Sequence, residues 1–291
     1  MNRRYLLESK FIDINGVSLN YGEGQLNGPT LVFLHGFPGA WTEHGPVYEL
    51  LEPYYHVIAP THRGLGQSQW SDSYSIPQWI DDVGDFIHAV VETPVLGVGH
   101  SAGSWFGLAA ANTDPGLFSA FVSLDQPLNP EVHIAYHTPR IPTVRAAAMA
   151  MREATDVDDL ARRLAQVPIS SGGTYGDLYS EAELAEYASE LSTSDPAIFN
   201  AWVNNDLASL IDVPEVKAWP GAYRNPLLFL DGDPGAGSLV SVEGAAYNME
   251  RYPWARRIEM PGLDHGLGLW DDPGPVVEEI RSFFHGLQSF K

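Results

Sequence analysis

The sequence predicts an α/β fold built on a mostly parallel sheet, and two observations support that prediction. Short, strongly apolar runs of β type alternate with longer helical patterns over most of the 291 residues, as βαβ units require. The composition is 44% hydrophobic and 18% charged, which supplies one sizeable core and excludes a disordered or coiled-coil chain. We therefore expect one core with an inserted piece.

The predicted strands begin with an antiparallel pair. Residues 11–14 and 17–21 flank Asn15-Gly16, which is the strongest two-residue signal for a hairpin turn. Six further runs have the near-continuous apolar character that is typical of strands covered on both faces. These runs are 30–34, 56–59, 94–98, 118–124, 226–230 and 257–260.

Helical patterns of the length that a crossover needs lie between the strands. They span residues 41–52, 76–91, 102–112, 242–250 and 275–286. The stretch 127–223 breaks the alternation, because helical patterns follow one another there without strand signals. Within it we predict helices over 156–166 and 181–191, and a flexible loop over 168–176.

Charge and cysteine content exclude several classes of function. The 37 Asp and Glu residues outnumber the 16 Lys and Arg residues, which gives a formal charge of -21. Because such a surface repels phosphate backbones and anionic lipids, we expect neither a nucleic-acid nor a membrane partner. The absence of cysteine excludes disulfides and thiolate chemistry. No signal-peptide core and no bilayer-spanning run occurs, so we expect a cytoplasmic protein. The oligomeric state stays open.

A Gly-x-Ser-x-Gly motif is the most informative segment. A predicted strand runs into Gly99-His-Ser-Ala-Gly103 and a predicted helix follows, which is the context of a nucleophile elbow. Small residues are needed there because Cβ atoms would clash with neighbouring backbone. The turn exposes the Ser101 hydroxyl above the sheet and points the first N–H groups of the helix at developing negative charge. Ser101 is therefore the predicted nucleophile.

The segment Phe33-Leu-His-Gly-Phe-Pro-Gly39 directly follows an earlier buried strand. An oxyanion hole for acyl transfer needs two convergent donors about 2.7–3.1 Å from the oxyanion, and backbone N–H groups can supply them. We expect the donors to be the N–H groups of Phe37 and Ala102. His35 is expected to hold the loop by hydrogen bonding.

Ten histidines are candidates for the general base, and His265 is the preferred one. It lies after the last predicted strand and before the last helix, where Gly-x-Ser-x-Gly hydrolases carry their base. His100 adjoins Ser101 but points from the next position of the turn, so we expect it to be a packed neighbour. His133 and His137 have i, i+4 spacing, but no Glu follows His133 and no third ligand is evident. Neither a metal nor a cofactor is predicted.

Together these motifs resemble the α/β-hydrolase superfamily over nearly the whole chain. The resemblance rests on His35-Gly36-Phe37-Pro38, the loop Thr61-His-Arg-Gly-Leu-Gly-Gln-Ser68, Gly99-His-Ser-Ala-Gly103 and Gly262-Leu-Asp-His265. Thr61 departs from it, since relatives usually carry Asp there. The resemblance implies an eight-stranded, mostly parallel sheet flanked by helices, with a helical cap inserted between strands six and seven. Residues 1–126 and 224–291 would form the core domain, and 127–223 the cap domain.

The acid that orients the base stays open between two strand ends. Many relatives use an Asp three residues past a glycine after strand seven; here that glycine is Gly232, and Gly235 occupies the acid position. The segment instead resembles that of haloalkane dehalogenases whose acid follows strand six, which would make Asp125 the acid. Asp125 is preferred, Asp233 is the alternative, and Asp231 is third. In several branches an Asp at the position of Asp125 anchors the cap, so this role is the competing one.

The serine nucleophile separates this chain from haloalkane dehalogenases and epoxide hydrolases, which attack with Asp. We expect a serine hydrolase that cleaves a carboxylic ester or lactone of modest size through an acyl-enzyme. The alternatives are a C–C bond hydrolase or a perhydrolase with the same triad, or a ligand-sensing receptor on the same fold. Candidate substrate contacts in the predicted cap are mostly aromatic and favour an apolar or partly aromatic substrate. They are Tyr136, His137, Phe199, Trp202 and Trp219.

Overall fold

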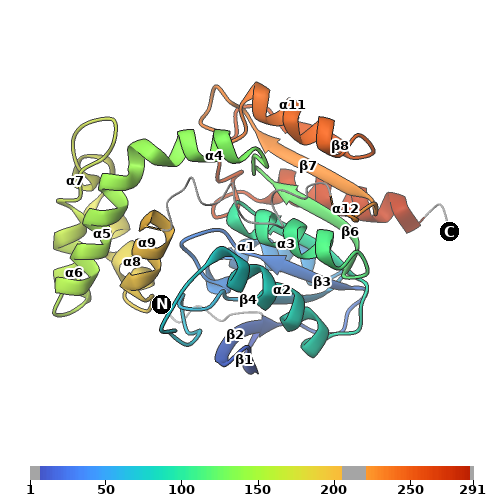
Figure 1. The fold of residues 1–291 in the computed structure, drawn as a ribbon, viewed down its shortest axis with the longest axis horizontal. Helices are drawn as coiled ribbons and strands as arrows, with labels where there is room; N and C mark the ends of the chain where they lie inside the picture. Colours follow the sequence, from blue (N-terminus) through green and yellow to red (C-terminus); the bar gives the residue numbers. More distant parts are fainter. Residues whose placement is uncertain (1–6, 205–220, 289–291) are drawn as a thin grey trace.

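The computed structural model describes residues 7–204 and 221–288, which contain one eight-stranded sheet with helices on both faces (Figure 1). The strands are β1 (Glu8–Ile14), β2 (Val17–Glu23), β3 (Thr30–Leu34), β4 (His56–Pro60), β5 (Val95–His100), β6 (Phe118–Leu124), β7 (Leu227–Gly232) and β8 (Arg256–Met260). Their order across the sheet is β1-β2-β4-β3-β5-β6-β7-β8. Strands β3 to β8 are parallel, whereas β2 pairs antiparallel with both β1 and β4. The predicted α/β fold class is therefore confirmed.

The hairpin that opens the sheet has the turn that its sequence predicts. Ile14 pairs with Val17, so Asn15 and Gly16 alone form the turn. Their φ angles are 52° and 78°, and a two-residue turn with positive φ at both positions matches the twist of the flanking strands. Asn15 and Gly16 adopt this conformation more readily than other residues.

The parallel strands end side by side at one edge of the sheet. Leu34 at the end of β3 pairs with Gly99 in β5, and His100 at the end of β5 pairs with Leu124 at the end of β6. Leu124 in turn pairs with Leu230 in β7. The loops that follow these strands therefore start next to one another, although they are far apart in the sequence.

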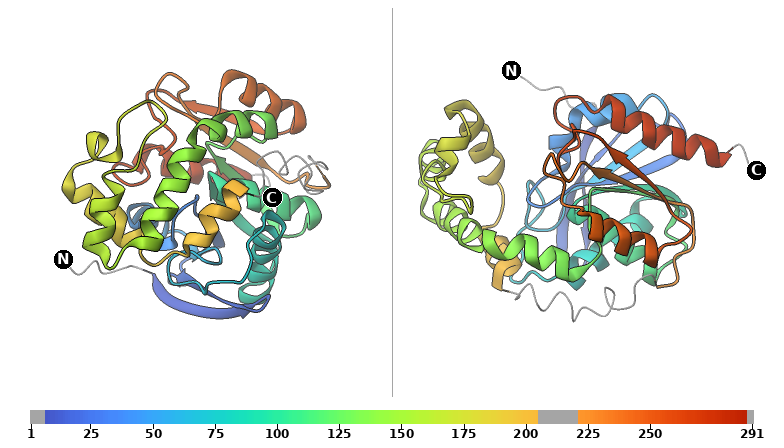
Figure 2. Two further views of the ribbon diagram at one scale, coloured as in Figure 1. Left: turned by 60° about the vertical axis from the view of Figure 1, so that its left-hand side comes forward. Right: turned by 90° about the horizontal axis from the view of Figure 1, so that it is seen from above.

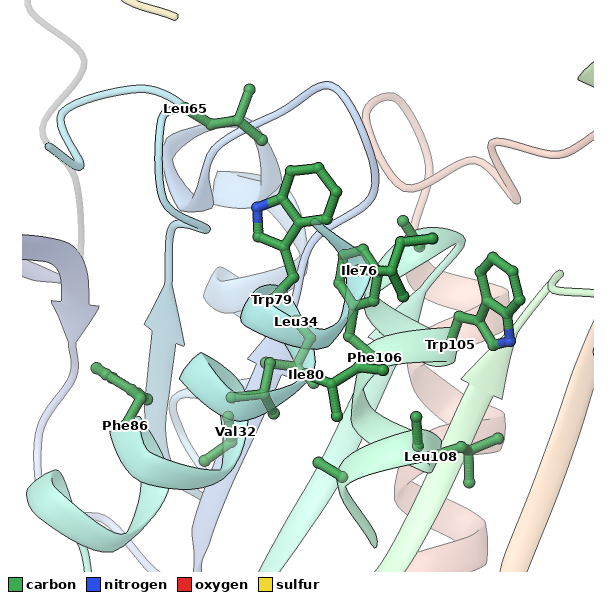
Figure 3. Close-up of a cluster of buried hydrophobic side chains, with 14 of the residues drawn as sticks. Val32, Leu34, Leu65, Ile76, Trp79, Ile80, Phe86, Trp105, Phe106 and Leu108 are labelled. Atoms are coloured by element: carbon green, nitrogen blue, oxygen red, sulfur yellow. The ribbon is translucent and has the colours of Figure 1, made fainter. Parts of the chain in front are cut away.

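Two hydrophobic clusters cover the two faces of the sheet. On one face, α2 (Ile76–Val90) and α3 (Ala102–Thr113) pack their aromatic side chains against β-strand residues (Figure 3). Trp79 and Phe106 lie nearly parallel there, with ring centroids 5.6 Å apart. On the other face, α1 (Gly45–Leu51) and α12 (Gly274–Gln288) complete the second cluster. Helix α11 (Val242–Arg251) lies between β7 and β8 in the chain.

Two predicted elements differ in the structure. Residues 41–52 form a 3-10 turn over Trp41–His44 followed by α1, because Pro46 occupies the first turn of the new helix. The predicted strand over 257–260 is confirmed as β8, but the expectation that both of its faces are covered is wrong. β8 is the edge strand, and its residues are half-buried or exposed. An edge strand needs polar side chains on its open side, and Arg256 and Arg257 meet that need.

A run of helices joins β6 to β7 and extends to one side of the sheet (Figure 1). The helices described are α4 (Pro130–His137), α5 (Ile141–Glu153), α6 (Val157–Leu164), α7 (Tyr175–Leu178), α8 (Glu181–Leu191) and α9 (Pro196–Asn204). We call the described residues between 127 and 223 the insertion. Its position in the chain agrees with the expected cap, and Figure 2 shows it arching away from the sheet. Its role as a separate cap domain, with the expected boundaries, stays a prediction.

Local signals explain where the helices of the insertion begin. Asp156 accepts a hydrogen bond from the Asp159 N–H, and Ser180 and Glu183 form a reciprocal capping box. The predicted loop 168–176 is a turn closed by a bridge between Pro168 and Thr174, after which α7 begins. Over residues 7–204 and 221–288, no helix has the length and apolar character that crossing a membrane requires.

Candidate functional site

The turn between β5 and α3 holds Ser101 in a strained conformation. Ser101 has φ 52° and ψ -123°, a region that residues with a side chain rarely adopt. The turn is secured by the Ser101 N–H, which donates to the Leu124 carbonyl at 3.0 Å, and by the Ser104 hydroxyl, which donates to the Gly99 carbonyl. Ser101 is half-buried, so its hydroxyl stays within reach of a ligand.

Gly103 in this turn has no room for a side chain. A Cβ atom there would lie 2.3 Å from the Leu34 carbonyl oxygen. We expect Gly103→Ala to lower the free energy of unfolding by about 3 kcal/mol, because the backbone of β3 must move. Gly84→Ala in α2 is the matched control, since nothing lies within 4 Å of its Cβ position. It should raise stability by about 0.5–1 kcal/mol. Urea titration of both variants measures this, and equal stabilities would contradict it.

The loops at the strand ends bring three of the predicted residues into one hydrogen-bonded chain. His265 Nε2 lies 3.0 Å from Ser101 Oγ, and His265 Nδ1 lies 2.7 Å from Asp125 Oδ2. Since an ionised carboxylate only accepts, Nδ1 carries the hydrogen and Nε2 is left to accept from the serine hydroxyl. A nucleophile, a base and an orienting acid would need this geometry.

Asp125 is fully buried and receives several hydrogen bonds. Its Oδ1 accepts from the Gly232 N–H at 2.8 Å and from the Ser238 hydroxyl, and its Oδ2 accepts from the Leu239 N–H at 2.8 Å. Burial alone would raise the pKa of Asp125, but the bonds from His265, Ser238 and Gly232 outweigh burial and lower it. Ser238 and Leu239 are not predicted from the sequence, because no motif marks the loop that follows β7.

The two other candidate acids have different partners. Asp233 Oδ2 accepts from the Gly262 N–H at 3.0 Å, and Asp233 Oδ1 accepts from the Gly235 N–H at 2.7 Å. Asp231 Oδ2 accepts from Arg257 Nε at 2.6 Å, and burial raises the pKa of Asp231 to about 7 despite that partner. Asp233 therefore shapes the loop after β7, and Asp231 joins β7 to β8.

The predicted oxyanion loop passes directly beside the serine. A Cβ atom on Gly36 would lie 3.1 Å from Ser101 Cβ, so Phe37 follows a residue that touches Ser101. Ala102 is the first residue of α3, where N–H groups have no partner within the helix. His35 Nε2 accepts from the His62 N–H at 3.1 Å, which fixes the loop as the sequence predicts.

Four buried histidines surround the turn: His35, His44, His62 and His100. Burial lowers the pKa of His44 to about 3 and that of His62 to about 4, and it places the pKa values of His35 and His100 well below the usual range. His100 Nε2 donates to the His265 carbonyl oxygen at 3.0 Å, and the two rings lie 4.9 Å apart. His100 therefore packs beside the candidate base, in agreement with the expected neighbour role.

These histidines should make the protein sensitive to acid. Below pH 6.5 the unfolded chain protonates these four histidines and also His137, whose pKa is lowered by burial to about 4. The folded chain keeps all five neutral, so stability falls as the pH falls. The carboxyls of Asp231 and Glu43, with pKa values of about 7 and 8, act in the opposite direction and hold two extra protons in the folded state. Five histidines against two carboxyls leave the unfolded chain with about three more bound protons than the folded chain near pH 5.5, so the free energy of unfolding falls as the pH falls.

Stability should therefore be highest between about pH 6.5 and 7, because above that range the two carboxyls lose their protons at a cost to the folded state. Urea titrations at pH 5, 6.5 and 8 measure the profile. His44→Phe should reduce by one the number of protons taken up on unfolding in acid, so the free energy of unfolding should fall less steeply with pH. A slope unchanged in that variant would contradict the assignment of His44.

Of the predicted substrate contacts in the insertion, some lie close to the candidate catalytic residues and others do not or are not described. Phe199 in α9 is buried against Phe37, with ring centroids 5.6 Å apart, so it lies beside the predicted oxyanion loop. Burial, the charge of Arg140 and the charge of His265, in decreasing order of effect, lower the pKa of His137 to about 4. His137 therefore lies near His265. Tyr136 lies under the guanidinium of Arg140, 3.6 Å from the ring centre. Trp219, the Trp202 side chain and the His133 side chain lie outside what the structure describes.

Comparison with known proteins gives the family. A family model described as "Alpha/beta hydrolase family" matches residues 31–279. The sn-1-specific diacylglycerol lipase ABHD11 of Xenopus tropicalis is 26% identical over 285 residues, which cover 94% of this chain and 83% of that protein. The 2-(acetamidomethylene)succinate hydrolase of Mesorhizobium japonicum is 24% identical over 261 residues, which cover 88% of each chain.

A solved structure supports the fold. The crystal structure of E-2-(acetamidomethylene)succinate hydrolase superposes with a TM-score of 0.73, at 21% identity, and covers 96% of this chain and 99% of that chain. At this identity the likeness extends to the fold alone. Because the family model spans most of the sequence, the assignment rests on that match: the chain belongs to the alpha/beta hydrolase family.

Proposed function

We propose that this protein is a serine hydrolase that cleaves a carboxylic ester or lactone of modest size through an acyl-enzyme intermediate. The observation that carries the proposal is the hydrogen-bonded chain from Ser101 through His265 to Asp125. A serine hydroxyl is a weak nucleophile until an adjacent base takes its proton. The spacing of 3.0 Å between Ser101 Oγ and His265 Nε2 permits that transfer.

In the first half of the reaction, His265 Nε2 takes the Ser101 proton as Oγ forms a bond to the ester carbonyl carbon. The C–O bond to the alcohol then breaks, and His265 returns the proton to the departing alkoxide. In the second half, His265 takes a proton from water, hydroxide adds to the acyl carbon, and the Ser101 oxygen leaves with that proton. The products are the free acid and the alcohol, and the enzyme is regenerated.

The surrounding groups stabilise the charges that develop. Asp125, ionised and buried, holds Nδ1–H of the imidazole and stabilises the imidazolium after proton transfer. The N–H groups of Phe37 and Ala102 are the proposed donors to the tetrahedral oxyanion. Each such donor contributes typically about 10²–10³-fold to kcat in related chemistry.

Relatives named as a lipase and as a hydrolase support hydrolysis, but their substrates differ. The surroundings of this site favour a neutral or cationic substrate over a dicarboxylate such as a succinate derivative. The formal charge is -21, and six carboxyl-bearing residues line the pocket beside the site. An anionic substrate would be repelled by both.

Labelling with a fluorophosphonate tests the nucleophile. We expect one covalent adduct per chain, located on Ser101 by peptide mass spectrometry, together with turnover of p-nitrophenyl esters that the label abolishes. Labelling at another residue, or full esterase activity after complete labelling, would overturn the proposal. A label on Ser101 without turnover of any ester or lactone would favour the ligand-sensing alternative.

A further inference from the structure

A pocket of about 980 Å³ lies between the core and the insertion. One wall comes from the segment that follows β3, including the 3-10 turn and α1, and from the loop after His265. The opposite wall comes from α7 and α8. The aromatic lining residues are Trp41, Tyr48 and Trp270 from the core and Tyr175, Tyr179 and Tyr187 from the insertion.

The side chains of this pocket are of two kinds. Six are aromatic, namely two Trp and four Tyr, and six are acidic. Among the described residues that line it, none is Lys, Arg or His. Rings with a negative face next to carboxylates are the environment that organic ammonium ions prefer.

The aromatic side chains come from both walls. On the insertion, the ring of Tyr175 lies 5.7 Å from that of Tyr179 and 6.2 Å from that of Tyr187, both edge-on. On the core, Tyr48 is only 2% exposed and its hydroxyl has no hydrogen-bond partner among the described residues. A buried hydroxyl without a partner costs free energy, and a ligand in the pocket could supply that partner.

Carboxyl groups line both walls of the same pocket. Burial and the negative charge of Glu190 raise the pKa of Glu43 to about 8. Glu43 belongs to the core, and Glu190 belongs to α8. The two walls therefore repel each other when both carboxyls are ionised, and a cation between them would remove that repulsion.

The pocket adjoins the candidate catalytic residues without including them. Pro38 follows Phe37 in the oxyanion loop. Trp270 lies 5.7 Å from the His100 ring, and the His100 ring lies 4.9 Å from that of His265. Along this path two side chains, those of Trp270 and His100, lie between a ligand in the pocket and His265.

We propose that this pocket binds an organic cation of the alkylammonium type. The cation is either a charged group of the ester substrate itself or a separate small amine that binds beside the substrate. A charged group of the substrate rests on the proposed ester hydrolysis, whereas the binding of a cation as such does not depend on it.

Calorimetry with the Ser101→Ala variant tests binding independently of hydrolysis. Butyrylcholine and benzyltrimethylammonium are the cationic probes, and 3,3-dimethylbutyl butyrate is the neutral isostere of butyrylcholine. We expect a cationic probe to bind about 10-fold more tightly than the isostere. Glu190→Gln and Tyr175→Leu should each weaken cation binding about 5-fold and leave the isostere unchanged. Glu181→Gln, on the same helix but outside the pocket, is the matched control and should change neither.

Steady-state kinetics of the parent protein distinguish the two sources. If the cation belongs to the substrate, kcat/KM for butyrylcholine exceeds that for 3,3-dimethylbutyl butyrate about 10-fold, and Glu190→Gln removes the preference. If the cation is a separate ligand, the two esters react alike while benzyltrimethylammonium still binds. Equal affinities of the Ser101→Ala variant for charged and neutral probes, in folded protein, would overturn the pocket assignment. If the parent protein hydrolyses no ester but still binds the cationic probes, the proposed function is wrong and the pocket assignment stands.

Discussion

Ser101→Ala should reduce kcat for an activated ester by about 10⁶-fold, to the level left by binding and the oxyanion donors. The serine oxygen is the only proposed acceptor of the acyl group, so no acyl-enzyme can form without it. His265→Ala should cost about as much, since an unactivated serine is a poor nucleophile at neutral pH. Initial rates with p-nitrophenyl butyrate measure both variants.

The double variant distinguishes a joint mechanism from two separate effects. If Ser101 and His265 act as one unit, Ser101→Ala/His265→Ala should be no slower than either single variant. If the loss of kcat in the double variant equals the product of the losses in the two single variants, the two residues act in different steps. A Ser101→Ala protein that retains more than about a hundredth of the parent rate would contradict the nucleophile assignment altogether.

Asp125→Asn should lower kcat by about 10⁴-fold, while Asp233→Asn should change it by less than about 2-fold. The amide at position 125 cannot hold the His265 tautomer or stabilise the imidazolium as a carboxylate does. Among the described residues, the Asp233 carboxyl accepts from backbone N–H groups of its own and the neighbouring loop, and an amide oxygen can still accept one of them.

Folding must be measured beside activity in this comparison. Asp125 accepts hydrogen bonds from Gly232, Ser238 and Leu239, so Asp125→Asn also weakens the link between β6 and the loop after β7. Thermal unfolding and circular dichroism separate the two effects. An inactive Asp125→Asn variant with a parental Tm supports the catalytic role. If Asp233→Asn is the crippled variant, the acid belongs to the loop after β7, and Asp125 has only an anchoring role.

The sequence by itself determined the features that depend on local chemistry. Asn15-Gly16 predicts its turn because few other pairs accept positive φ twice. The pattern Gly99-His-Ser-Ala-Gly103 predicts a strand-turn-helix, because two positions exclude any Cβ atom. The position of His265 after the last strand likewise follows from chain order. These are properties of short segments, so they can be identified before the fold is known.

The tertiary structure decided what depends on loops meeting in space. Asp125 and Asp233 were alternatives in the sequence, and the distance of 2.7 Å from Asp125 to His265 depends on how β6, β7 and the loop after β8 converge. The edge position of β8 depends on strand order, which the apolar pattern does not encode. The aromatic and acidic pocket joins residues near 43 to residues near 187. No motif links those segments, because only the packing of the insertion against the core brings their side chains together.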